Sequence, residues 1–329
     1  MKVSRIAWSV VRTGVGIALL VWLSRSGLLD WRQIAALRAE PGALLLALGL
    51  MAGGLAATAW RLCVLATPLN FSIRFGASLR LLLIGTCFNV LMPGAAGGDI
   101  ARLYLTLRDQ QGRRTELAAI LIFDRVVGLV ALLFVPLMAA LVFPGVARLY
   151  PTIVTILTWA AGLAVLAGLV ALGLWGPIGR AWVTRHLPWL PLDGIVARAA
   201  AAMRAYRAFP GAVAGALALS LAATLLGLLS MLVLARVVGA TGSAEMMLVL
   251  LPIGVLVNTI PLTPGGLGVG EVAMDRLFSL AGLTGGAATL ITWRLFLLIP
   301  AALGLVLYIQ GRADFVAPAR PPDSSAVAA

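Results

Sequence analysis

Long apolar segments run through most of this chain and leave few folds open to it. About six of them reach the roughly 20 residues that a helix needs to cross a bilayer. They lie at about 6–24, 43–66, 117–143, 152–174, 212–239 and 287–309. The composition agrees, since 61% of the 329 residues are hydrophobic and only 11% are charged. We therefore predict an all-α polytopic membrane protein, and a soluble fold is excluded.

Two further apolar runs, at about 76–92 and 246–263, end in clusters of proline and glycine that cannot continue a helix. Both clusters follow one order: an asparagine, a Pro-Gly step, further glycines and a single carboxylate. The first contains Asn89, Pro93, Gly94, Gly97, Gly98 and Asp99, and the second contains Asn258, Pro264, Gly265, Gly266 and Glu271. Paired interrupted segments of this kind, one in each half of a membrane protein, indicate a transport site.

The spacing of later arginines supports an internal duplication. Arg125 follows Pro93 by 32 positions, and Arg294 follows Pro264 by 30. We predict one integral-membrane domain over residues 1–312, with a first repeat at about 5–143 and a second at about 152–310. A disordered tail is expected over 313–329, where proline, serine and alanine dominate.

The basic residues favour one topology. The net charge of +13 reflects the bias of arginine and lysine toward cytoplasmic loops, so no nucleic-acid partner is expected. If the run at 76–92 re-enters instead of spanning, Arg74 and Arg80 stay on the same side as the arginines at 102–114. We therefore predict six spans plus two re-entrant helical hairpins, with both termini cytoplasmic and the two halves inverted. A spanning segment at each break is the alternative that stays open.

Five ionisable residues at membrane depth are the candidates for chemistry, because such residues are expensive in lipid. They are Asp99, Asp124, Arg125, Glu271 and Arg294. If the two hairpin tips meet, helix N-termini and glycine amides converge beside the arginines, and this would suit a phosphate-bearing headgroup. A structural interpretation is equally open, in which the carboxylates cap helices and the arginines form ion pairs.

Other polar residues are expected to have structural roles. Asn89 and Asn258 would either bond the backbone groups that the breaks leave unpaired, the role that we favour, or contact the ligand of the predicted site. Arg61, near the end of the second span, is expected to reach the membrane interface. The single His186 and the two separated cysteines form no metal-binding pattern, and no nucleotide motif or catalytic triad occurs. We expect no metal, no cofactor and no enzymatic activity.

These motifs resemble those of a known family. The matching segments are Phe88-Asn89 through Pro93-Gly94 and Gly97-Gly98-Asp99, then Asp124-Arg125-Val126-Val127-Gly128, then Pro261-Leu262-Thr263-Pro264-Gly265-Gly266-Leu267-Gly268 with Glu271. They resemble the bacterial and archaeal flippase-like proteins related to the transmembrane region of lysylphosphatidylglycerol synthase, over about residues 5–312. In bifunctional members this region moves aminoacylated phosphatidylglycerol between leaflets, and a separate soluble domain makes it. This sequence ends soon after its last span, so we expect no synthase domain.

The resemblance implies lipid translocation in the bacterial inner membrane. The expected cargo is an anionic or phosphate-bearing lipid: an anionic phospholipid, a polyprenyl-phosphate lipid or a hopanoid-related lipid. Two alternatives stay open. One is an integral-membrane lipid-modifying transferase that uses Asp99 or Glu271 as acid or base, and the other is a non-catalytic partner of a lipid-synthesis enzyme.

Overall fold

The computed structural model describes residues 39–91, 97–108, 113–145, 206–258 and 267–310, with the single positions 151, 155, 158, 159 and 162. Several predictions fall outside these residues. They are the span at 6–24, most of the span at 152–174, the tail at 313–329 and the site residues Pro93, Gly94, Pro264, Gly265 and Gly266.

Every element among the described residues is a helix. They are α3 (Pro41–Ala66), the short η2 (Thr67–Leu69), α4 (Phe75–Leu91), α5 (Gly97–Leu107), α6 (Arg114–Val142), α11 (Pro210–Val237), α12 (Ala244–Asn258), α13 (Val269–Leu280) and α14 (Gly286–Ile309). The stretches formed by α3 with η2, α6, α11 and α14 are long and apolar enough to cross a membrane. These four helices confirm the predicted apolar segments that they overlap, to within a few residues.

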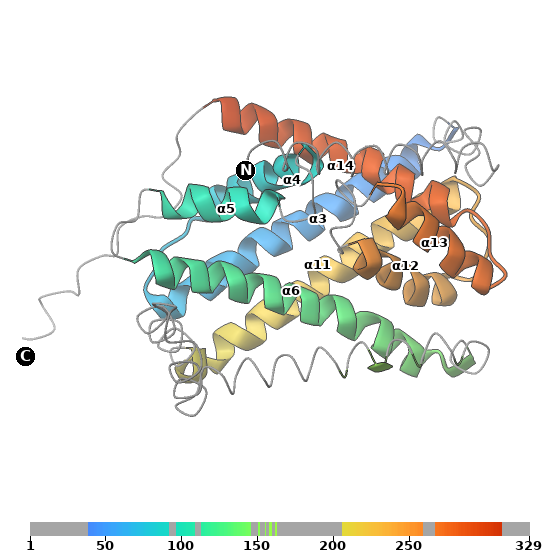
Figure 1. The fold of residues 1–329 in the computed structure, drawn as a ribbon, viewed down its shortest axis with the longest axis horizontal. Helices are drawn as coiled ribbons and strands as arrows, with labels where there is room; N and C mark the ends of the chain where they lie inside the picture. The colour runs from blue at the N-terminus through green and yellow to red at the C-terminus, as the bar shows by residue number, and fades with distance from the viewer. Residues whose placement is uncertain are drawn as a thin grey trace, which may run out of the picture.

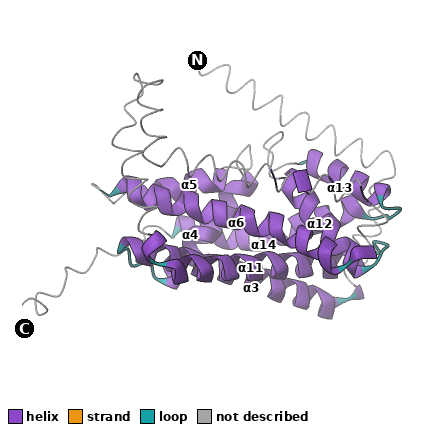
Figure 2. Ribbon diagram, turned by 90° about the horizontal axis from the view of Figure 1, so that it is seen from below, coloured by secondary structure: helices purple, strands orange, loops and turns teal. Residues whose placement is uncertain are grey.

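The helices α3 and α11 pack against each other along most of their length in opposite directions (Figures 1 and 2). Near one end, the Ser230 hydroxyl donates a hydrogen bond of 2.6 Å to the Ala47 carbonyl. Near the other end, the Tyr206 hydroxyl donates one of 2.8 Å to the Leu65 carbonyl. Between them, Gly54 lets the backbones approach, since a Cβ there would lie 3.1 Å from the Ala223 carbonyl oxygen.

Two shorter helix pairs, α4 with α5 and α12 with α13, each fold back on themselves. In the first pair Gly98 donates its amide to Asn89 Oδ1 at 2.7 Å, and four residues away on each helix Gly85 lies against Arg102. The second pair repeats this pattern, because Gly270 faces the Asn258 side chain and Gly254 faces Met274. Each asparagine therefore faces a glycine at the start of the returning helix.

The two helix pairs start from opposite ends of the bundle. The first follows α3 through η2, and the second follows α11. Because α3 and α11 are antiparallel, α4 begins at one end and α12 at the other, as Figure 1 shows. Helix α14 contacts both pairs: Gly304 packs on the Leu83 backbone of α4, and Gly286 packs on the Met274 backbone of α13.

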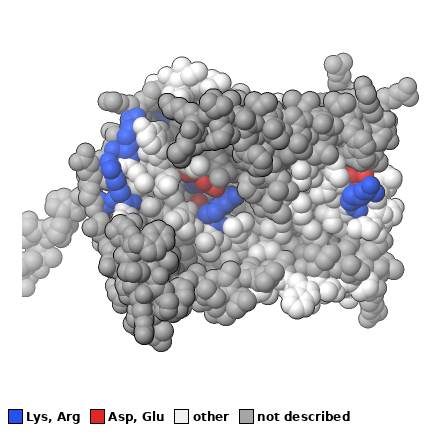
Figure 3. Space-filling view, in the orientation of Figure 1, with Lys and Arg blue, Asp and Glu red and all other residues white. Residues whose placement is uncertain are grey.

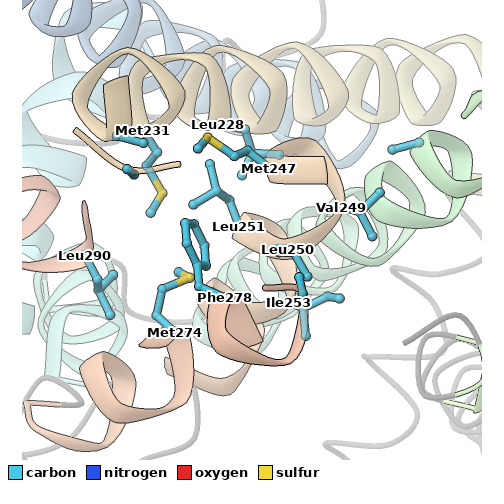
Figure 4. Close-up of a cluster of buried hydrophobic side chains, with 14 of the residues drawn as sticks. Leu228, Met231, Met247, Val249, Leu250, Leu251, Ile253, Met274, Phe278 and Leu290 are labelled. Atoms are coloured by element: carbon cyan, nitrogen blue, oxygen red, sulfur yellow. The ribbon is translucent and has the colours of Figure 1, made fainter. Parts of the chain in front are cut away.

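The larger hydrophobic core lies where α11, α12, α13 and α14 meet. Figure 4 shows the Phe278 ring pointing toward Leu251, with Met274 beside it. All three side chains are fully buried. A second core joins α3, α4 and α6 near Leu62, Leu81 and Leu117. The first core includes residues of α12 and α13, and the second includes Leu81 of α4, so each helix pair is anchored in a core.

The close contact at Gly304 leads to a stability prediction. We expect Gly304→Ala to lower the thermal unfolding midpoint in detergent by at least about 3 °C, because its Cβ would collide with the Leu83 carbonyl group. Gly49→Ala is the matched control, since a Cβ at this helical position meets nothing within 4 Å. It should keep or raise the midpoint, because alanine favours the helix. Equal midpoints for the two variants would contradict the packing described here.

Candidate functional site

A cavity of about 350 Å³ lies between the first helix pair and helices α3, α6 and α11. Val255 of α12 and Trp293 of α14 reach it from the second half of the chain. Its charged and amide-bearing lining consists of Arg61, Asn89, Asp99, Arg102, Asp124 and Arg125. Figure 3 shows acidic and basic atoms together near the middle of one face, surrounded mainly by uncharged or undescribed residues.

Asp124 is the buried centre of this charged group, with a side chain only 2% exposed. Its Oδ1 lies 2.7 Å from Arg61 Nε, and its Oδ2 lies 3.4 Å from Arg102 Nη2. Arg61 also donates from Nη1 to the Ser220 hydroxyl at 2.8 Å. A buried charge needs partners of opposite sign and hydrogen bonds to persist in a low-dielectric interior. Here one carboxylate joins α3, α5 and α6, and Ser220 adds α11.

The prediction for Arg61 was wrong. Instead of reaching the membrane interface, its side chain is 8% exposed and lies inside the bundle. Gly128, one turn after Asp124, makes room for it, since a Cβ at this position would lie 3.0 Å from Arg61 Nη1. The sequence did contain a signal for this role of Arg61, namely Asp124. A buried aspartate at membrane depth requires a cation, which another helix can supply.

Near Asp124, Tyr206 stacks on Phe123 with ring centroids 4.5 Å apart. Burial raises the pKa of the Tyr206 phenol, and the Asp124 charge raises it further. The phenol therefore stays protonated and keeps donating to the Leu65 carbonyl. This contact ties the residues before α11 to the end of α3.

Asp99 and Arg125 form a looser ion pair at the open side of the cavity. Asp99 lies in the first turn of α5, and its Oδ2 is 3.4 Å from Arg125 Nε. The side chains are 37% and 49% exposed, so an occupant of the cavity can reach both. Although Asp124 and Arg125 are adjacent in the chain, they pair with different partners, one inside the cavity and one at its edge.

The second half contains the corresponding residues in a closed arrangement. Glu271 Oε1 lies 2.6 Å from Arg294 Nε, and the Glu271 side chain is completely buried. Glu271 Oε2 also accepts the Gly268 amide at 2.7 Å, and Arg294 Nη2 donates to Asn258 Oδ1 at 2.7 Å. The structural interpretation of these residues, a helix cap and a bundle ion pair, matches this geometry.

The predicted site residues thus separate into two groups instead of one. Asn89, Asp99, Asp124 and Arg125 line the cavity, and Gly97 and Gly98 are buried at the start of α5 beside it. The second group, formed by Asn258, Glu271 and Arg294, does not line the cavity. Arg102 and Arg276, which follow the two carboxylates, also differ, because Arg102 lines the cavity while Arg276 is exposed.

Arg102 was not among the predicted site residues, since its position after the break suggested a cytoplasmic loop. The structure instead places it on α5, facing α4 and Asp124. Within the described residues, no three His, Cys, Asp or Glu side chains come together in a way that could hold a metal ion. The polar side chains that line the cavity carry guanidinium, carboxylate, amide and hydroxyl groups.

The contrast between the two ion pairs predicts unequal effects on stability. Glu271→Gln removes the fully buried partner of a pair whose other member is only 18% exposed, and breaking a buried pair costs about 3–5 kcal/mol. Asp99→Asn removes one partner of a half-exposed pair, whose contribution is about 0–1 kcal/mol. We expect thermal unfolding in detergent to show a clearly lower midpoint for Glu271→Gln and nearly no change for Asp99→Asn. The reverse order would contradict the assignment of the second cluster as structural.

Comparison with known proteins agrees with this architecture. A search of curated proteins finds no match. The family model of the lysylphosphatidylglycerol synthase TM region matches residues 8–304, which is nearly the whole chain and includes both helix pairs and every charged residue of the two clusters. The chain therefore belongs to the family of the lysylphosphatidylglycerol synthase transmembrane region, a multi-pass membrane protein family linked to lipid biology.

Proposed function

We propose that this protein moves an anionic, phosphate-bearing lipid between the leaflets of the bacterial inner membrane. The observation that carries the proposal is the charged cavity, which is set among four helices of membrane-spanning length and is reached through the exposed Asp99 and Arg125 side chains. Family membership supports a role in lipid biology. The protein binds and releases its cargo without chemical change.

The size and surroundings of the cavity suit a lipid headgroup. A volume of about 350 Å³ accommodates a small polar group, while two acyl chains are far too large for it. The helix surface next to Arg125 is apolar, since Ile122, Val126 and Val130 of α6 are all about half exposed. The headgroup would occupy the cavity while the acyl chains lie along α6 in the hydrocarbon.

The arrangement of the two helix pairs suggests how access alternates. The pairs start from opposite ends of the bundle, and we interpret them as re-entrant hairpins of an inverted repeat. The loose Asp99–Arg125 pair would open as a phosphate replaces the carboxylate on Arg125. The tight Glu271–Arg294 pair would stay closed and serve as the fixed part against which the first pair moves.

The charge distribution supports one orientation in the membrane. Arginines at the end where α3 finishes and α6 and α11 begin are Arg74, Arg80, Arg108, Arg113, Arg114 and Arg207. Figure 3 shows a group of basic atoms toward one end of the molecule. The opposite end carries Glu40 and Glu245, with Arg236 and Arg276. By the positive-inside bias, the arginine-rich end faces the cytoplasm, where a lipid-synthesis enzyme would supply the cargo.

The function is tested by transport in proteoliposomes that contain fluorescent phosphatidylglycerol. We expect the wild-type protein to speed exchange between leaflets, measured as loss of fluorescence to an impermeant quencher. Arg125→Gln should slow this exchange at least about tenfold, because a charge-assisted bond to phosphate is lost. Arg276→Gln, an exposed arginine outside the cavity, is the control and should behave as wild type. Exchange no faster than in empty liposomes would overturn the proposal.

The topology is tested by labelling with a membrane-impermeant maleimide in intact and permeabilised cells. Cysteines would be introduced singly by Arg108→Cys at the end of α5 and by Ala244→Cys at the start of α12; both positions are exposed. If both pairs are re-entrant, the first cysteine reacts only after permeabilisation and the second reacts in intact cells. Labelling of the Arg108→Cys variant in intact cells would mean that the first apolar run spans.

A further inference from the structure

The cavity carries one positive charge in excess. Among its lining residues, Arg61, Arg102 and Arg125 are cationic, Asp99 and Asp124 are anionic, and the others are uncharged. The nearby Glu271 and Arg294 neutralise each other and do not line it. In a site surrounded by apolar helices, an unmatched charge is unfavourable and strongly attracts one opposite charge.

The excess charge is concentrated on Arg102. Arg61 is well bonded, because Nε and Nη1 both lie within 2.8 Å of an oxygen. Arg102 approaches Asp124 only at 3.4 Å, and its buried Nε has no hydrogen-bond partner among the described residues. A buried guanidinium donor that lacks an acceptor is costly, especially when it carries charge. Arg102 therefore has a buried donor without an acceptor in the described part of the chain, and its side chain is part of the cavity lining.

Gly85 holds Arg102 in this position. A Cβ at Gly85 would lie 2.8 Å from Arg102 Cδ and 2.9 Å from Cγ. A side chain at position 85 would therefore displace Arg102 from its place against α4. This packing brings the guanidinium next to Asp124 and away from Asp99, which pairs with Arg125 instead. The donor is thus positioned before any ligand arrives.

We infer that the cavity selects a phosphodiester group of net charge −1 and that Arg102 is a further residue that binds it. One diester anion balances the excess charge and supplies acceptor oxygens for Arg102. A zwitterionic headgroup carries no net charge, so it leaves the excess positive charge of the cavity unbalanced. A phosphomonoester dianion carries two negative charges, one more than the single excess positive charge of the cavity, so it would leave one negative charge unbalanced.

A free glycerophosphodiester has the same phosphate chemistry as a phospholipid headgroup. That the diester belongs to a lipid therefore rests on the proposed function.

The test is calorimetric titration of the purified protein in detergent micelles. The probes are dihexanoyl phosphatidylglycerol, dihexanoyl phosphatidylcholine, dihexanoyl phosphatidate at pH 8.5 and water-soluble glycerophosphoglycerol. We expect phosphatidylglycerol to bind at least about tenfold more tightly than phosphatidylcholine. Tighter binding of phosphatidylglycerol than of glycerophosphoglycerol identifies a lipid ligand, and the reverse identifies a soluble one.

Substitutions distinguish the effect of the net charge of the cavity from the effect of the Arg102 side chain. Arg102→Gln and Gly85→Ala should each weaken phosphatidylglycerol binding about tenfold, the first by removing the guanidinium and the second by displacing it. Asp99→Asn, which raises the excess charge to two, should shift the preference about tenfold toward phosphatidate. Arg276→Gln should leave all affinities unchanged. Equal binding of phosphatidylcholine and phosphatidylglycerol by the wild type, or an unchanged preference in Asp99→Asn, would overturn the inference even if Arg102→Gln fails to fold.

Binding in micelles involves no leaflets, so its result is independent of transport. Charge-selective binding without lipid exchange in proteoliposomes would overturn the proposed function and leave the inference intact. Exchange of phosphatidylglycerol without charge-selective binding would overturn the inference about charge and Arg102 and leave the proposed function intact.

Discussion

The contact on which the rest of the bundle depends is the buried Asp124 carboxylate between Arg61 and Arg102. It joins three helices, and the Ser220 hydroxyl brings in a fourth through Arg61. Removing one member would leave a charge in a medium that solvates it poorly, which costs about 3–5 kcal/mol for a buried pair. The same carboxylate holds two guanidinium groups in the lining of the cavity.

The two halves use equivalent residues in different ways. In both, a carboxylate at the start of a returning helix pairs with an arginine on a long helix. In the second half this pair, Glu271 with Arg294, is short, buried and reinforced by the Gly268 amide. In the first half Asp99 and Arg125 are partly exposed and 0.8 Å farther apart, at 3.4 Å against 2.6 Å. Packing closes the second pair and leaves the first accessible.

Local signals in the sequence were enough to predict the long helices and the two interrupted runs, because helix length and proline or glycine breaks depend on neighbouring residues. They also indicated Asp99, Arg125, Glu271 and Arg294. They did not indicate Arg61, whose partner Asp124 lies 63 positions away on another helix. Arg102 was missed for a related reason, since its role depends on Gly85 across the helix pair. Contacts between helices are set by which faces meet, and a single sequence leaves this open.

The excess charge at Arg102 breaks the rule that buried polar groups are paired, and such exceptions occur where function requires them. An unsatisfied donor raises the free energy of the empty cavity relative to that of the occupied cavity. A ligand that supplies one negative charge removes this cost. Binding in the cavity therefore depends more on the net charge of the ligand than on its shape. An ion pair at the open side can exchange its carboxylate for the same anion, which lets the ligand enter without stranding Arg125. Selectivity and access would then depend on one quantity, the balance of guanidinium and carboxylate groups around the cavity.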